Sequence, residues 1–116
     1  MPVVSGTIVF GADLEPFAGA IVYVRLEDVS RIDASAVMVA ETVLQDVRAG
    51  GQAPSQLEFT IDAPPLDPRA RYIVRVHVDV DADGQVGIGD YVSTISHSVP
   101  TDVEAPRLLI PVKRVS

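Results

Sequence analysis

The sequence predicts an all-β protein, a single-domain antiparallel β-sandwich of about seven strands that spans residues 1–116. Valine is the first indication, because 20 of the 116 residues are valine and side chains branched at Cβ fit a pleated strand better than a helix. Several segments also alternate between apolar and polar residues, which is typical of antiparallel strands with one face on the core. Turn-rich stretches with proline and glycine separate these segments and interrupt the strands.

Two strands are expected near the start of the chain, at Val3–Phe10 and Ala20–Asp28. The faces of the first are less cleanly separated. The second alternates strictly, so one set of side chains is expected on the core and the other on the opposite face: Val22, Val24 and Leu26 against Tyr23, Arg25 and Glu27.

The segment Asp33–Val47 fits two secondary structures. As a helix it would start at an N-cap formed by Asp33 or Ser35, end at Gly50, and carry one apolar stripe of Val37, Ala40, Leu44 and Val47. As a strand it would alternate between two faces, Met38, Ala40, Thr42 and Leu44 against Val37, Val39, Glu41 and Val43. The strand is favoured, because β-branched residues are frequent here and the neighbouring segments are strands.

Four further strands complete the prediction: Gln56–Asp62, Arg71–Val80, Tyr91–Val99 and Arg107–Lys113. Three of them alternate clearly, and their expected core residues are Leu57, Phe59 and Ile61, then Tyr72, Val74, Val76 and Val78, and finally Leu108, Ile110 and Val112. The strand Tyr91–Val99 has less distinct faces.

The composition excludes several classes of function. The formal net charge is −7, only 5% of residues are aromatic and there is no tryptophan, so nucleic acids and anionic membranes are disfavoured as partners. The chain has no cysteine, which excludes thiol catalysis, disulfides, cysteine-based zinc sites, iron–sulfur clusters and lipidation at a mature N-terminal cysteine. We expect no membrane-spanning helix, because no apolar run reaches about 18 residues, and the start MPVVSG shows no export signal.

The segment DVDADGQVGIGD, Asp79–Asp90, has the spacing of a twelve-residue calcium loop. Carboxylates stand at positions 1, 3, 5 and 12, a glycine at position 6 and the Gln85 carbonyl at position 7, so the predicted ligands are Asp79, Asp81, Asp83, Gln85 and Asp90. Calcium is the expected cofactor, because an oxygen-only site suits this hard cation and the loop holds no histidine or cysteine for zinc.

This loop also has a plainer interpretation. Position 12 is Asp rather than a bidentate Glu, and strands rather than helices are expected on both sides. Asp83-Gly84 is a common hairpin turn, and the other aspartates would keep such a turn soluble. If a cation binds, its expected role is to stiffen the connection between two strands.

The sequence offers little for catalysis, and we expect no enzymatic activity. The two histidines are His77, expected to be solvated on the outer face, and His97, which lies in the serine-rich run Ser93–Ser98. That run offers a nucleophile and a base, but no orienting carboxylate or oxyanion hole can be assigned to it.

Three segments of the chain are distinctive: SGTIV at Ser5–Val9, AIVYVRLEDVSR at Ala20–Arg31 and DPRARYIVRV at Asp67–Val76, with Val39-Ala40-Glu41 between the second and the third. Together they resemble the YbaY/YscW-type lipoprotein family, which includes the pilotins, or lipoprotein chaperones, of type III secretion, and Val39-Ala40-Glu41 matches an I-A-E segment of that family. The chain departs from the family in lacking a lipobox cysteine and in its longer, more acidic loop at Asp79–Asp90.

The resemblance implies a β-sandwich without enzymatic activity in a periplasmic or outer-membrane setting, and a strand at Val37–Leu44. Pilotins bind a secretin subunit, so the implied partner is a secretin-like or other outer-membrane protein, engaged at an exposed sheet edge. The alternative is a calcium-stabilised structural or adhesion module outside the cytoplasm that uses the Asp79–Asp90 loop.

Overall fold

The computed structural model describes residues 3–31, 35–52, 54–94, 97–102 and 105–116. This part of the chain contains eight strands and no helix. The strands are β1 (Val3–Phe10), β2 (Phe17–Asp28), β3 (Val37–Ala49), β4 (Gln56–Asp62), β5 (Tyr72–Asp79), β6 (Tyr91–Ser93), β7 (His97–Ser98) and β8 (Arg107–Arg114). The all-β prediction is therefore confirmed, and most strand bounds agree with the alternating pattern to within a few residues.

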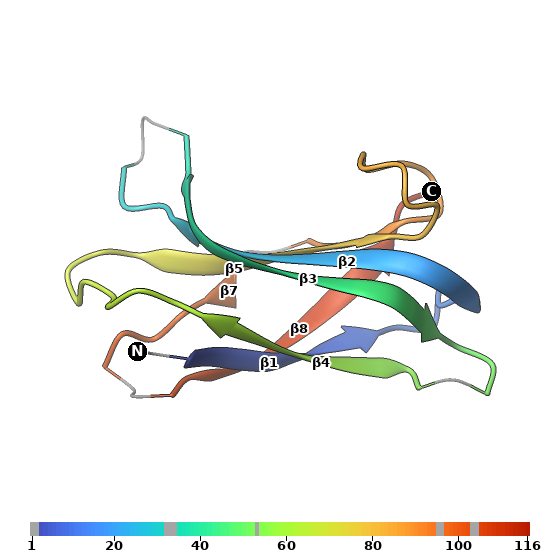
Figure 1. The fold of residues 1–116 in the computed structure, drawn as a ribbon, viewed down its shortest axis with the longest axis horizontal. Helices are drawn as coiled ribbons and strands as arrows, with labels where there is room; N and C mark the ends of the chain where they lie inside the picture. Colours follow the sequence, from blue (N-terminus) through green and yellow to red (C-terminus); the bar gives the residue numbers. More distant parts are fainter. Residues whose placement is uncertain (1–2, 32–34, 53, 95–96, 103–104) are drawn as a thin grey trace.

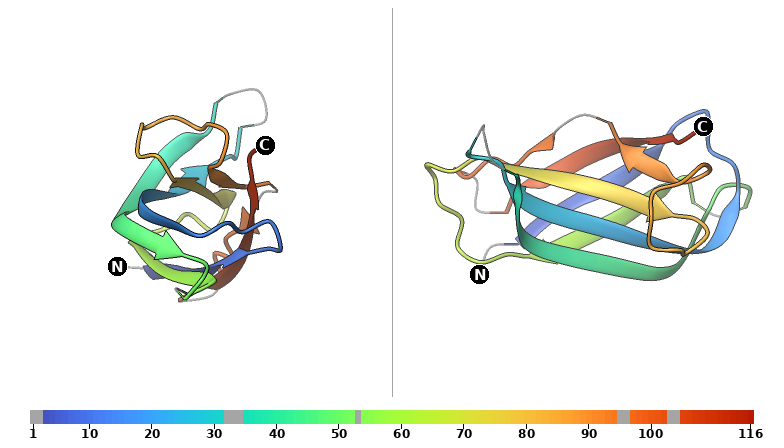
Figure 2. Two further views of the ribbon diagram at one scale, coloured as in Figure 1. Left: turned by 90° about the vertical axis from the view of Figure 1, so that its right-hand side faces the viewer. Right: turned by 90° about the horizontal axis from the view of Figure 1, so that it is seen from above.

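The strands form one continuous sheet, and the predicted antiparallel sandwich is wrong in this respect. The order is β3-β2-β5-β6-β8-β1-β4, with β7 paired to β5. β1 and β8 run parallel, whereas the other pairs are antiparallel. The sheet curls around a common interior until its two edge strands, β3 and β4, approach each other, as in a nearly closed barrel (Figures 1 and 2).

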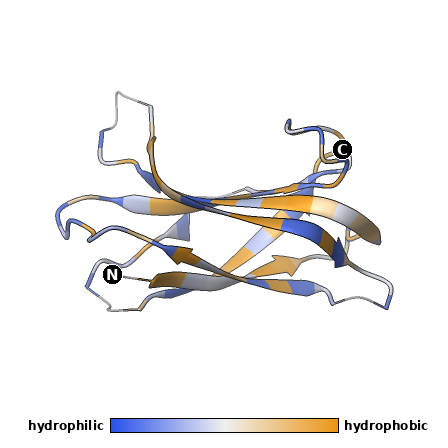
Figure 3. Ribbon diagram, in the orientation of Figure 1, coloured by the Kyte–Doolittle hydropathy of each residue, from blue (hydrophilic) through white to orange (hydrophobic). Residues whose placement is uncertain are grey.

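The interior is filled by the predicted inward set of side chains. Val22, Val24 and Leu26 of β2 are fully buried, and so are Val74 and Val78 of β5. Phe10, Phe17 and Tyr91 pack edge-on or tilted against one another with ring centroids 5.1–5.7 Å apart. Figure 3 shows the resulting alternation of apolar and polar residues along the strands. Removing apolar side chains from water is the main force that closes the sheet.

The ambiguous segment is a strand from Val37 to Ala49, as favoured by its β-branched residues. Asp33, one of the two N-caps of the helical alternative, lies outside the described residues. The predicted strand Tyr91–Val99 is instead two short strands, β6 and β7, with residues 95–96 between them outside the described part. Only β6 pairs with β8, whereas both pieces pair with β5.

Candidate functional site

The acidic loop connects β5 to β6 and projects from one end of the sheet (Figure 1). Four of the predicted ligands lie together in it: one carboxylate oxygen from each of Asp79, Asp81, Asp83 and Asp90 falls within 4.8 Å of the others. Asp79 and Asp90 are buried at the ends of the loop, and Asp81 and Asp83 are exposed. Gln85, the fifth predicted ligand, is exposed, and its N–H donates to Asp83 Oδ1 at 3.0 Å.

Asp79 organises the first half of the loop. Its carboxylate accepts hydrogen bonds from the N–H groups of Gly84 at 2.8 Å and Asp83 at 3.3 Å. Gly84 has a φ of 82°, a conformation that glycine adopts without steric cost, so the glycine at position 6 serves the sharp turn that the spacing predicts. Asp79 thus closes the turn through the backbone.

Two carboxyl groups of the loop have opposite pKa shifts. Burial acts to raise the pKa of Asp79, but hydrogen bonds from Gly84, Asp81 and Asp83 outweigh it and lower this pKa below 3.8. The pKa of Asp81 is raised above 3.8 because its carboxyl shares a hydrogen bond with Asp79, is partly desolvated and lies near the charges of Asp83 and Asp90. The loop therefore concentrates negative charge that a proton or a cation would neutralise.

Asp90 fastens the second half of the loop to the sheet. Its Oδ1 accepts from the Val80 N–H at 3.0 Å, and its Oδ2 accepts from the Gly87 N–H at 3.1 Å. Oδ2 also lies 2.9 Å from Nε2 of His77 on β5. The backbone of Asp90 accepts a further bond from the Val115 N–H, which ties the loop to the residues after β8.

His77 faces away from the core as predicted, but it is not solvated. Its side chain is only 15% exposed, because it lies between the Asp90 carboxylate and the ring of Tyr23, which stacks on it at a centroid distance of 5.7 Å. His77, Asp79 and Asp90 form a second group with mutually close ligand atoms. The sequence pattern missed this contact because it shows which face a strand residue occupies but not which loop folds over that face.

The other histidine and the serine run do not assemble a catalytic site in the described residues. His97 pairs in register with Val74, a core residue, and its Nε2 is buried without a hydrogen-bond partner among the residues described. Ser93 Oγ accepts a hydrogen bond from the Val76 N–H at 3.0 Å, which occupies it structurally.

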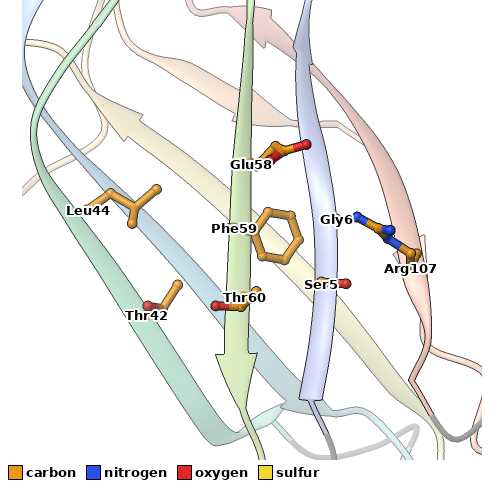
Figure 4. Close-up of a pocket in the computed structure, with 8 residues that line it drawn as sticks. All are labelled: Ser5, Gly6, Thr42, Leu44, Glu58, Phe59, Thr60 and Arg107. Carbon is orange, nitrogen blue, oxygen red and sulfur yellow. The ribbon is translucent and has the colours of Figure 1, made fainter.

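A second feature is the open seam between the edge strands β3 and β4. These strands follow each other in sequence, yet they do not pair with each other in the sheet. Three irregularities interrupt the register between β2 and β3, and bulges of this kind bend and twist a strand. A groove of about 230 Å³ lies at the seam (Figure 4), lined by Ser5, Gly6, Thr42, Leu44, Glu58, Phe59, Thr60 and Arg107.

The hydrogen bonds of the neighbouring strands show which backbone groups of β4 face the seam. The Phe10 N–H donates to the Ser55 carbonyl and the Ser5 N–H to the Pro106 carbonyl, so even-numbered residues of β1 bond to β4. Since backbone bonds alternate along an antiparallel pair, the N–H and C=O groups of Leu57, Phe59 and Ile61 point toward β1. The N–H and C=O groups of Glu58 and Thr60 therefore point toward the seam.

The same reasoning applies to β3. The Val29 N–H donates to the Arg71 carbonyl, so odd-numbered residues of β2 bond to β5 and even-numbered residues bond to β3. The N–H and C=O groups of Thr42 and Leu44 therefore form hydrogen bonds with β2. Those of Glu41 and Val43 point toward the seam. Of the large apolar side chains exposed in the described residues, Val37, Met38 and Val43 lie on this strand.

Three comparisons with known proteins bear on these features. The model of the type III secretion system lipoprotein chaperone (YscW) family matches residues 1–103. No curated protein sequence matches the chain significantly. Among solved structures, an alternative pilotin from the type II secretion system of Vibrio cholerae superimposes with a TM-score of 0.75 at 24% identity, covering 98% of this chain and 96% of that one. The structural likeness supports the fold, and no helix in the described residues is long and apolar enough to cross a membrane.

Proposed function

The chain belongs to the type III secretion system lipoprotein chaperone (YscW) family, and from this membership we propose that it is a non-enzymatic, chaperone-like module that binds a polypeptide at the β3–β4 seam. The proposed partner is a secretin subunit or another outer-membrane component, and the proposed location is the periplasm or the periplasmic face of the outer membrane. The open seam, with the unpaired edges of two strands on either side of one groove, is the observation that carries the proposal.

An extended segment fits this seam for a physical reason. Unpaired N–H and C=O groups at a sheet edge are completed by another strand, and the seam presents such groups from Glu58 and Thr60 on one side and Glu41 and Val43 on the other. The exposed apolar residues Val37 and Met38 at the start of β3 would lose contact with water against the same partner. The partner would thereby cover an edge that otherwise invites aggregation.

A matched pair of variants at Thr60 tests this mode of binding. Replacing Thr60 by proline removes an N–H that points into the seam. It breaks no hydrogen bond to β1, so the strand should tolerate the change. We expect Thr60→Pro to weaken binding of a secretin peptide by roughly tenfold, the value of about one hydrogen bond. The measurement is calorimetric titration with synthetic peptides that tile the C-terminal region of a secretin subunit.

Thr60→Val is the control, because it changes the side chain and keeps the N–H. Its affinity should stay close to that of the unchanged chain, and both variants should keep the β-sheet circular dichroism spectrum. Unchanged affinity in Thr60→Pro, or an equal loss in both variants, would show that the peptide does not pair with the backbone of β4.

We propose calcium binding by the acidic loop as a second function, which stiffens the β5–β6 connection. The supporting observation is the close approach of the four carboxylates of Asp79, Asp81, Asp83 and Asp90. Like charges at this distance repel, and oxygen ligands of this kind suit calcium. The pKa of Asp81 is raised first by the hydrogen bond that its carboxyl shares with Asp79, then by desolvation and by the nearby charges of Asp83 and Asp90.

Calcium titration followed by calorimetry and thermal melting tests this second proposal. We expect calcium to raise the melting temperature, and Asp81→Asn combined with Asp83→Asn to abolish the effect. The pKa of Asp81 is raised, so as the pH falls this carboxyl takes up a proton earlier than an ordinary Asp would. The affinity for calcium should therefore decrease as the pH is lowered toward and below this pKa. Equal stabilisation by magnesium, or persistence in the double variant, would contradict a calcium site here.

A further inference from the structure

Two arginines face each other on the outer surface of the sheet. Arg25 of β2 and Arg75 of β5 are direct register partners. Because the Val29 N–H donates to the Arg71 carbonyl, odd-numbered residues of β2 bond to β5, so the backbones of Arg25 and Arg75 bond to each other. Like charges directly opposite each other on neighbouring strands destabilise a sheet. The pairing thus needs a compensating interaction.

Carboxylates compensate each arginine on only one side. The Arg25 Nε donates to Glu41 Oε2 at 2.6 Å, and the Arg75 Nε donates to Glu27 Oε1. Within the described ranges, the structure records no partner for the terminal Nη groups of either guanidinium. Both arginines are therefore held in place and still have donors available for an anion.

A hollow of about 220 Å³ lies beside this arginine pair. Its lining consists of Tyr23, Arg25, Arg75, Val76, His77, Val86, Val92 and Ser93, so it contains no carboxylate although the chain carries 16 acidic residues. The Tyr23 ring supports one side of the site, because the Arg25 guanidinium lies 5.4 Å from its centroid and His77 stacks on it. Val86, from the acidic loop, contributes an apolar part of the wall.

We propose that this hollow binds a carboxylate that carries a short apolar group. The carboxylate would lie between the guanidiniums of Arg25 and Arg75, which offer the planar donors that carboxylates accept. The apolar group would contact Val86 and Val92. A singly charged ligand is favoured over a phosphate, because the net charge of −7 opposes further negative charge. No residue lines both this hollow and the groove at the seam, so binding at each can be tested separately.

The test uses 4-methylpentanoate as the probe and the Arg Nε–Hε signals in ¹H–¹⁵N NMR spectra as the readout. We expect saturable shifts of the Arg25 and Arg75 signals with a Kd on the order of millimolar, as befits a ligand of few atoms. Arg75→Gln should weaken binding by about tenfold or more. Arg71→Gln is the matched control, since it removes the same charge from an exposed residue just before β5, and it should leave the affinity unchanged.

A second variant keeps the test decisive if Arg75→Gln perturbs folding. Val86 is 59% exposed in a loop, so Val86→Asp should leave the fold intact while placing a repelling charge on the wall of the hollow, and it should weaken binding severalfold. The neutral amide of the probe should not bind. Equal shifts with the amide, or unchanged affinity in Val86→Asp, would overturn the proposal.

Two sources of the carboxylate are distinguished by a further titration. Acetyl-Ala-Ala-Leu with a free C-terminus should bind at least as tightly as 4-methylpentanoate if the natural ligand is the end of a polypeptide. Weaker binding of the peptide would indicate a free short-chain acid, and both results support a carboxylate site. Absence of any saturable shift with either probe would refute it.

Discussion

Replacing Asp90 by alanine is expected to lower the free energy of unfolding by about 3–5 kcal/mol, because it removes a buried acceptor and leaves its hydrogen-bond donors unsatisfied. The Asp90 side chain is 1% exposed and accepts from Val80, Gly87 and His77. Without it, two backbone N–H groups and the His77 ring lose their acceptor. Urea unfolding followed by circular dichroism in the presence of a chelator measures this cost apart from any cation.

Two variants separate this effect from a general loss of charge. Asp90→Asn keeps the shape but turns one acceptor into a donor, so it should recover only part of the loss. Asp62→Ala removes an exposed carboxylate from β4 and should change stability by less than about 0.5 kcal/mol. A loss below about 1 kcal/mol in Asp90→Ala would show that the loop is not held by this side chain.

The strands were predictable because alternation is a local property. The faces of β2, β4, β5 and β8 follow directly from residues such as Val24, Phe59 and Val76, each of which needs only its neighbours in sequence to be assigned inward. The neighbours of each strand in the sheet are not local. The parallel pairing of β1 with β8 joins Ser5 to Arg107, and nothing in either segment distinguishes this pairing from an antiparallel one.

The acidic loop and the seam differ in the same way. The spacing of Asp79, Asp81, Asp83 and Asp90 within one short segment predicted a cluster that the structure contains. The seam depends on β3 turning away from β4, although strands joined by so short a connection commonly form a hairpin. Irregularities in the β2–β3 register accompany that separation, and one of them spans Asp46, whose φ is 54°. Asp tolerates this conformation better than most residues, but a single Asp within an alternating segment does not by itself predict a bulge.

Replacing Gly6 by alanine is expected to lower the free energy of unfolding by about 1–3 kcal/mol, the usual cost of inserting a methyl group into a filled interior. An added Cβ would lie 2.6 Å from the carbonyl oxygen of Leu108 and 2.7 Å from Cζ of Phe59. The Leu108 oxygen belongs to β8, the parallel partner of β1, and cannot move away alone. The β1–β8 pairing would have to loosen, which thermal and urea unfolding would detect.

A second substitution separates the cost of the clash with Phe59 from the cost of the clash with Leu108. The experiment therefore tests the order of the strands as well as the packing. Phe59→Leu in the Gly6→Ala background removes the ring contact but leaves the contact with Leu108, so the two substitutions should interact favourably yet not restore full stability. Gly87→Ala is the matched control, because its Cβ would meet nothing within 4 Å. If Gly6→Ala were as harmless as Gly87→Ala, Leu108 could not lie against Gly6, and β1 would not be the parallel neighbour of β8.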